Sequence, residues 1–154
     1  MADAFTVLWD NDGVLVDTER LYFAASAEAL ASVGVELTRE QFIEISLQRG
    51  AGVFDLADHL DAARVAELRR WRNDYYTELI GSSPRLVIDG VEPALGRLAG
   101  RVAMGVVTSS RGDHFEAIHA RSGLLGYFDF VVTREDYPRS KPWPDPYLTA
   151  MERQ

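Results

Sequence analysis

The 154-residue chain contains no cysteine and only three histidines. Without cysteine it can form neither disulfide bonds nor thiolate metal centres, and its composition is compatible with a reducing cytoplasm, where we expect the protein to reside. Because histidine is scarce and 24 residues are acidic, any bound metal ion should be a hard cation held by oxygen ligands.

The chain also lacks an excess of basic residues and long apolar runs. Its 16 lysines and arginines leave a net charge of -8, which argues against a nucleic-acid partner because phosphate binding needs clustered positive charge. No run approaches the roughly 20 apolar residues of a membrane span, and no basic-then-apolar leader opens the chain, so we expect no membrane association. An apolar share of 47% is ample for the core of one domain with an insertion.

The stretch from Phe5 to Glu19 is the most informative in the sequence. Its apolar start predicts a buried strand that delivers Asp10 and Asp12 to its carboxyl end. Residues two apart in an extended segment point the same way, and Gly13 permits a sharp turn, so the carboxylates can share one crevice. Taken alone, Asp-Asn-Asp-Gly also fits an ordinary turn. A calcium loop is excluded because apolar residues occupy its fifth and sixth positions.

Residues 17–83 read as a helical block inserted after this strand. Gly34 can end a first helix, Thr38 and Gln41 form a capping box for a second, and further helices are expected over residues 53–60 and 62–80. The long last helix should bury the following side chains: Val65, Leu68, Tyr75 and Leu79. Its arginines, including Arg69 and Arg72, read as a solvated face.

From residue 84 onward, strands and helices alternate. Helices are predicted over residues 91–98 and 113–121, and strands over residues 102–107 and 130–132. Such alternation predicts a parallel sheet with right-handed crossovers. We therefore expect an α/β fold in which residues 1–16 and 84–154 form a doubly wound, Rossmann-like core and residues 17–83 form an inserted helical domain.

Two further segments bring polar groups toward the same edge of the predicted sheet. Thr108 ends the second strand, where it could equally serve as a helix cap or a turn residue. Lys141 lies in a proline-rich loop after the third strand; a single loop lysine is usually a solvated surface charge. Together with Asp10 and Asp12, these groups could supply a nucleophile, a proton donor and ligands for phosphoryl oxygens.

In this combination the chain resembles the haloacid dehalogenase superfamily, in particular its phosphatase and β-phosphoglucomutase-like branch. The resemblance is carried by three segments: Asp10-Asn-Asp-Gly-Val-Leu-Val-Asp-Thr-Glu19, Val106-Val-Thr-Ser109 and Lys141-Pro-Trp-Pro-Asp145. It implies that Asp10 is a nucleophile that forms an aspartyl-phosphate, and that Asp12 is a general acid and base. Mg²⁺ would be bound by Asp10 and Asp12.

The same resemblance assigns further roles. Thr108 and Lys141 would act in catalysis, and the residues that contact phosphate or substrate would be the following: Asn11, Gly13, Ser109, Ser110 and Arg49. The inserted helices would be a cap that covers the site and selects the substrate. His114 and His119 read as ordinary surface or packing residues.

The function expected from these residues is a magnesium-dependent phosphatase that hydrolyses a small phosphorylated, sugar-phosphate-like metabolite. A phosphomutase with the same aspartyl-phosphate is an alternative, and so is a non-catalytic fragment or binding module. The family continues with strands that carry acidic metal ligands, whereas this sequence stops at Gln154. We therefore expect that further sequence or a second chain covers the first strand's other edge. The oligomeric state is left open.

Overall fold

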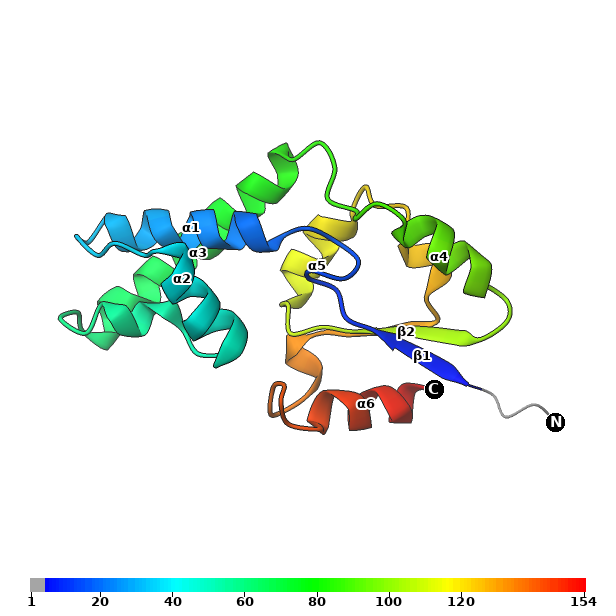
Figure 1. Cartoon of the computed structure of the whole chain (residues 1–154). Coiled ribbons are helices and arrows are strands. Elements are labelled where there is room, and N and C mark those ends of the chain that lie inside the picture. The colour runs from blue at the N-terminus through cyan, green and yellow to red at the C-terminus, as the bar shows by residue number, and fades with distance from the viewer. Residues whose placement is uncertain (1–4) are drawn as a thin grey trace. The chain divides into compact units, whose positions relative to one another are not determined.

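The computed structural model describes residues 5–154. The chain divides into two compact units, one formed by Met1–Thr18 and Pro84–Gln154 and the other by Glu19–Ser83 (Figure 1). The second unit thus begins two residues later than the insertion predicted from the sequence.

The first unit is built on a three-stranded sheet. Its strands are β1 (Thr6–Trp9), β2 (Ala103–Val107) and β3 (Phe130–Val132), in the order β1-β2-β3, and both strand pairs are parallel. This confirms the predicted parallel α/β architecture. Trp9 lies opposite Val106, so the residues that follow β1 and β2 emerge side by side at the carboxyl edge of the sheet.

Three helices cover this sheet. Helices α4 (Val91–Leu98) and α5 (Gly112–His119) lie on one side, and α6 (Asp145–Arg153) lies on the other (Figure 1). The short 3₁₀ turns η3 (Leu125–Tyr127) and η4 (Arg134–Asp136) flank β3. On the α6 side the buried core comprises Val107, Val132, Tyr137 and Ala150. The sheet is therefore covered on both faces, as a parallel sheet requires.

The presence of glycine at position 105, in the middle of β2, is explained by the residue that pairs with it on β3. Gly105 pairs with Phe130, whose ring lies over the strand so closely that a Cβ on residue 105 would sit 2.3 Å from a ring carbon. Ordinary carbon contacts are about 3.5–4.0 Å. No larger side chain fits here unless the ring moves.

Strand β1 forms one edge of the described sheet. Within residues 5–154 it pairs with β2 alone, and all four of its residues are partly exposed. The expectation that further sequence or another chain covers its second edge stays a prediction.

The second unit is helical throughout its regular structure. It contains α1 (Glu19–Ala31), α2 (Arg39–Phe42), the π-helical segment η1 (Ile43–Gln48), the 3₁₀ turn η2 (Val53–Leu56) and α3 (Ala62–Ser82). The capping box of Thr38 and Gln41 is present, and Gly34 adopts a φ of 79° after α1. The helix expected over residues 53–60 is wrong beyond its first turn, because Leu60 closes a separate turn and Asp61 then caps α3.

The buried face of α3 differs by one residue from the predicted face. Leu68 is buried as expected, but Arg72, Tyr76 and Ile80 are buried in place of Tyr75 and Leu79. The structural reason is that α1 packs against α3 and the Arg72 guanidinium stacks 4.4 Å above the Tyr22 ring.

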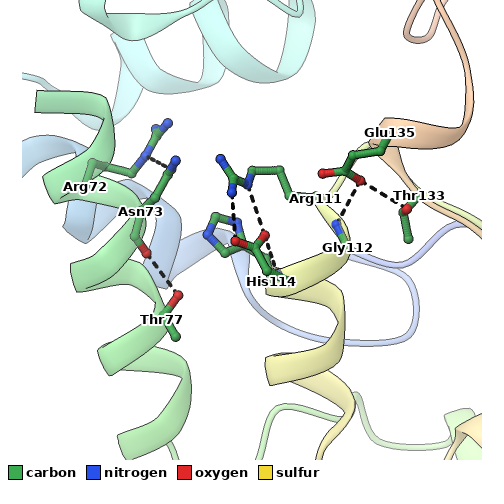
Figure 2. Close-up of polar contacts among 9 residues, drawn as sticks. Arg72, Asn73, Thr77, Arg111, Gly112, His114, Thr133 and Glu135 are labelled. Atoms are coloured by element: carbon green, nitrogen blue, oxygen red, sulfur yellow. Dashed lines mark hydrogen bonds and ion pairs between the residues drawn. The ribbon is translucent and has the colours of Figure 1, made fainter. Parts of the chain in front are cut away.

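Arg72 is therefore not part of a solvated face, as its sequence context suggested. Its side chain donates a hydrogen bond to Asn73 Oδ1 at 2.9 Å (Figure 2). It donates another to Ser26 Oγ at 3.3 Å. Burial lowers the pKa of Arg72. A delocalised guanidinium on an apolar stem tolerates such an environment better than an ammonium does. Among residues 5–154, no helix has the length and apolar character needed to cross a membrane.

Candidate active site

Asp10 and Lys141 form the centre of the polar site at the carboxyl edge of the sheet. Lys141 Nζ lies 3.0 Å from Asp10 Oδ2 and donates a hydrogen bond to the Val107 carbonyl oxygen at 2.9 Å. The Lys141 side chain is 22% exposed and that of Asp10 is 46% exposed. The lysine is thus held in place, while the carboxylate stays open to a ligand.

The Asp12 carboxylate is surrounded by hydrogen-bond donors of the same unit. It accepts from the Thr18 hydroxyl at 2.5 Å and from the Ser110 hydroxyl at 2.6 Å. Longer contacts come from the Thr108 hydroxyl at 3.4 Å and from the Asn11 amide at 3.3 Å. These donors fix the orientation of the Asp12 side chain.

A tight backbone turn connects the two aspartates to the rest of the chain. The carbonyl oxygen of Asn11 accepts backbone hydrogen bonds from Val14, Leu15 and Val16 at 3.2, 2.8 and 3.2 Å. Gly13 within the turn has a φ of 76°, which a residue with a side chain rarely adopts. The sequence prediction of a sharp turn at Gly13 is confirmed.

The side chain of Asn11 points into the protein, and the expected contact of Asn11 with phosphate stays a prediction. Asn11 is fully buried, and its side-chain oxygen lies 2.8 Å from His119 Nε2. Its backbone N–H donates to Asp10 Oδ1 at 2.8 Å. The Asn11 side chain is therefore engaged within the protein.

Thr108 is fixed at the end of β2 by contacts on all sides. Its N–H donates to the Val132 carbonyl at 3.0 Å, and its own carbonyl accepts from the Tyr137 hydroxyl at 2.8 Å. Its hydroxyl accepts from the Ser110 N–H at 3.0 Å. Thr108 is fully buried, whereas Ser109 beside it is exposed. The structure therefore brings Asp10, Asp12, Thr108, Ser110 and Lys141 together, and their roles in catalysis and phosphate binding stay predictions.

Glu135 anchors the start of the helix that follows this loop. Its carboxylate accepts hydrogen bonds from the Gly112 N–H at 3.0 Å and from the Thr133 hydroxyl at 3.1 Å (Figure 2). At the same helix end, Arg111 holds the Asp113 carboxylate, which lowers the pKa of Asp113. The Glu135 and Asp113 carboxylates accept from N–H groups in the first turn of α5 and suit its helix dipole.

The carboxylates of Asp10 and Asp12 suit Mg²⁺, but they supply only part of its coordination sphere. Magnesium is commonly held by one or two carboxylates, with water and substrate phosphate oxygens supplying the other ligands. The half-exposed Asp10 carboxylate and the adjacent Asp12 fit that pattern. Across the described residues 5–154, no three histidine or acidic side chains gather into a complete metal site. Mg²⁺ binding by Asp10 and Asp12 therefore stays a prediction.

Arg49, the predicted substrate contact, belongs to the second unit. It follows η1, it is exposed, and it pairs with the Glu44 carboxylate. Its role toward a substrate stays a prediction.

His119 is 3% exposed, which agrees with the packing part of the expectation that it is a surface or packing residue. The sequence did not show that it touches Asn11, the residue between the two aspartates. A signal was present in the sequence, because His119 follows Phe115 by four residues and so shares its helical face. The two rings lie 4.4 Å apart.

Comparison with known proteins decides the family. Residues 7–154 match the haloacid dehalogenase-like hydrolases. The chain belongs to this haloacid dehalogenase-like hydrolase family. The family resemblance inferred from the three sequence segments is thereby confirmed.

Two curated relatives within this family are phosphatases. The fructose-1-phosphate phosphatase of Escherichia coli is 28% identical over 152 residues, which cover 96% of this chain and 78% of the relative. The phosphorylated carbohydrates phosphatase of Thermotoga maritima is 28% identical over 156 residues, with 96% and 69% covered. The haloacid dehalogenase-like chain described here thus spans roughly two thirds to four fifths of these relatives' lengths.

Solved structures of the family share the fold. A putative β-phosphoglucomutase from Thermotoga maritima is 26% identical and superimposes with a TM-score of 0.70, over 96% of this chain and 69% of that one. A putative phosphoglycolate phosphatase from Lactobacillus plantarum has a TM-score of 0.79 at 20% identity, with 97% and 71% covered. The second likeness concerns the fold alone.

Proposed function

We propose that this chain carries the catalytic residues of a magnesium-dependent phosphatase that hydrolyses a small phosphorylated metabolite through an aspartyl-phosphate. The observation that carries the proposal is the contact between Asp10 and Lys141, 3.0 Å apart, beside the hydrogen-bonded carboxylate of Asp12. A half-exposed carboxylate can attack phosphorus, and the neighbouring ammonium can balance the charge of the phosphoryl group.

In the first half-reaction, an Asp10 oxygen forms a bond to phosphorus while the bond from phosphorus to the ester oxygen breaks. Asp12 gives its proton to the departing ester oxygen, which leaves as an alcohol. Thr18 and Ser110 hold the Asp12 carboxylate through hydrogen bonds of 2.5 and 2.6 Å. General acid catalysis of this type contributes about 10²–10⁴-fold.

In the second half-reaction, water attacks the phosphorus of the aspartyl-phosphate. Asp12 now takes a proton from that water, the bond between phosphorus and the Asp10 oxygen breaks, and inorganic phosphate is released. Asp10 and Asp12 return to their starting protonation states, so the cycle needs no further reactant.

Charge on the phosphoryl oxygens is balanced by groups already in place. Lys141 would supply an ammonium, and the exposed Ser109 would supply its backbone N–H at the carboxyl end of β2. Bound Mg²⁺ would be held by Asp10 and Asp12 and would supply further positive charge beside the phosphoryl group. The helical unit Glu19–Ser83, which includes Arg49, would act as the cap that selects the substrate.

The substrate class follows from the relatives. Two of them are named for fructose 1-phosphate and for phosphorylated carbohydrates, which favours sugar phosphates for this chain. A putative β-phosphoglucomutase is among the similar structures, so transfer of the phosphoryl group to a second sugar hydroxyl is the second candidate function.

A panel of sugar phosphates, assayed for phosphate release with and without Mg²⁺, tests the proposal. We expect magnesium-dependent release that disappears in Asp10→Asn, because an amide is a poor nucleophile and a weak metal ligand. Activity near wild type in Asp10→Asn would refute the assignment. Conversion of a sugar phosphate to its isomer without phosphate release would instead identify a mutase.

A further inference from the structure

A chain of buried hydrogen bonds links helix α5 to the two aspartates. His119 Nε2 lies 2.8 Å from Asn11 Oδ1, and His119 Nδ1 lies 2.8 Å from Ser122 Oγ. Ser122 Oγ in turn accepts the Leu124 N–H at 3.1 Å. Asn11 is fully buried and His119 is 3% exposed, so water does not replace these contacts easily.

The direction of each hydrogen bond follows from the chemistry of the groups. The Asn11 side-chain N–H donates to Asp12 Oδ2 at 3.3 Å, so the Asn11 side-chain oxygen faces His119 and can only accept from it. His119 therefore carries its proton on Nε2 and donates it to Asn11. Its Nδ1 then accepts from the Ser122 hydroxyl. Burial lowers the pKa of His119 to about 4, consistent with this neutral form near pH 7.

Asn11 transmits this arrangement to both aspartates. Its backbone N–H bonds Asp10 Oδ1 at 2.8 Å, and its side-chain amide faces Asp12 Oδ2 at 3.3 Å. Its carbonyl oxygen also holds the turn that follows. The orientation of one buried amide thus influences the nucleophile and the general acid together.

We propose that His119 is a positioning residue that orients the Asp10 and Asp12 carboxylates through Asn11, without touching the substrate. Without the His119 donor, the buried Asn11 oxygen loses its partner, and the amide is free to turn its oxygen toward Asp12. That orientation would replace the amide donor to Asp12 Oδ2 with an acceptor. The inference about turnover rests on the proposed phosphatase function, whereas the hydrogen-bond arrangement does not.

The kinetic test compares His119→Phe with two other variants, using p-nitrophenyl phosphate as the probe. Loss of this hydrogen bond should lower kcat on the order of tenfold with little change in KM. His119→Gln keeps an N–H donor and should recover much of the loss. His114→Phe makes the same change at another buried histidine of α5 and should retain kcat.

A double-variant cycle tests the route through Asn11. In an Asn11→Leu background, His119→Phe should cause no further loss of kcat, because the group through which His119 acts is gone. An equal further loss in that background would contradict the proposal, and so would an unchanged kcat in His119→Phe alone.

Nitrogen NMR of the wild-type protein decides the hydrogen-bond arrangement without any turnover. We expect the His119 ring to be neutral at pH 7 with its proton on Nε2, and the Asn11 side-chain amide to exchange slowly with solvent. That protection should fall in His119→Phe and persist in His114→Phe. A proton on Nδ1, or rapid exchange of the Asn11 amide in the wild type, would overturn the proposal. Absence of phosphatase activity with the expected spectra would refute only the proposed function.

Discussion

Replacing Lys141 with methionine removes the charge beside the proposed nucleophile while keeping a side chain of similar length. Lys141 Nζ touches the Asp10 carboxylate at 3.0 Å and the Val107 carbonyl at 2.9 Å. In the transition state the same ammonium would face a phosphoryl group bonded to Asp10. A donor aimed at developing charge is worth about 2.7–4 kcal/mol, so we expect kcat to fall on the order of 10²–10³-fold.

The effect of Lys141→Met on stability should be much smaller. The ion pair joins a carboxylate that is 46% exposed to a lysine that is 22% exposed, and such pairs contribute about 1 kcal/mol or less. Loss of the hydrogen bond to the buried Val107 carbonyl adds about 1–3 kcal/mol. Urea unfolding should therefore show a folded protein of moderately reduced stability.

Arg139→Met is the matched control for Lys141→Met. Arg139 belongs to the same loop and pairs with Asp145, which is 9% exposed, with one contact of 3.0 Å and another of 2.9 Å. Its loss leaves a buried carboxylate without that partner, which costs a comparable amount of stability. We expect Arg139→Met to be destabilised but to keep its kcat. Equal losses of kcat in both variants would refute a specific role for Lys141.

Three further predictions concern packing, pH and metal. Gly105→Ala should lower the free energy of unfolding, measured by urea titration, by about 1–3 kcal/mol, because its Cβ would meet the Phe130 ring at 2.3 Å. The control is Gly96→Ala, which lies in α4 with open space around it. This variant should be neutral or stabilising in the same titration. A Gly105→Ala variant as stable as wild type would contradict the packing argument. The pKa of His119 falls from 6.5 to about 4 on folding, so the unfolded chain binds the extra proton between these values. The free energy of unfolding should therefore decrease by about 3 kcal/mol as pH falls through that window, and its dependence on pH should be weaker in His119→Phe. If the unfolding midpoints of wild type and His119→Phe changed identically with pH, the lowered pKa of His119 would be contradicted. Removal of Mg²⁺ with a chelator should abolish phosphate release, and added Mg²⁺ should restore it. Full activity of the enzyme in the presence of the chelator would contradict the proposed role of Mg²⁺ in phosphate release.

The core of the first unit could be predicted because its signals are local and redundant. The apolar run before Asp10, the strand that ends at Val107 and the strand Phe130–Val132 each end at a polar group or a turn. Alternation with helices then fixes parallel pairing. The same logic placed Asp10 and Thr108 at one edge, because parallel strands bring their carboxyl ends together.

The helical unit was harder to predict from its sequence. In α3, Tyr75 and Tyr76 are adjacent and both suit a buried face, so the pattern does not decide between them. The burial of Arg72 decides it, and that depends on Tyr22 and Phe54 from elsewhere in the chain. The hydrophobic periodicity of a helix does not indicate that one of its charged residues stacks on aromatic rings from other parts of the sequence.

The contact between Asn11 and His119 could not be predicted for a similar reason. His119 lies 108 positions from Asn11 in the sequence, and neither residue type indicates that the two side chains form a hydrogen bond. An asparagine between two aspartates reads as a turn residue or a ligand contact. Only the fold shows that its side chain points inward to a buried imidazole.

The most direct measurement of the central claim is chemical trapping of the aspartyl-phosphate. Asp12→Ala should slow hydrolysis of the aspartyl-phosphate. The variant should therefore accumulate this intermediate when it is mixed with a substrate that has a good leaving group, such as p-nitrophenyl phosphate, and acid quenching should preserve it. Borohydride reduction followed by peptide mass spectrometry should then convert residue 10 to homoserine and leave residue 12 unmodified. Modification at any other residue, or none under conditions of active turnover, would contradict Asp10 as the nucleophile.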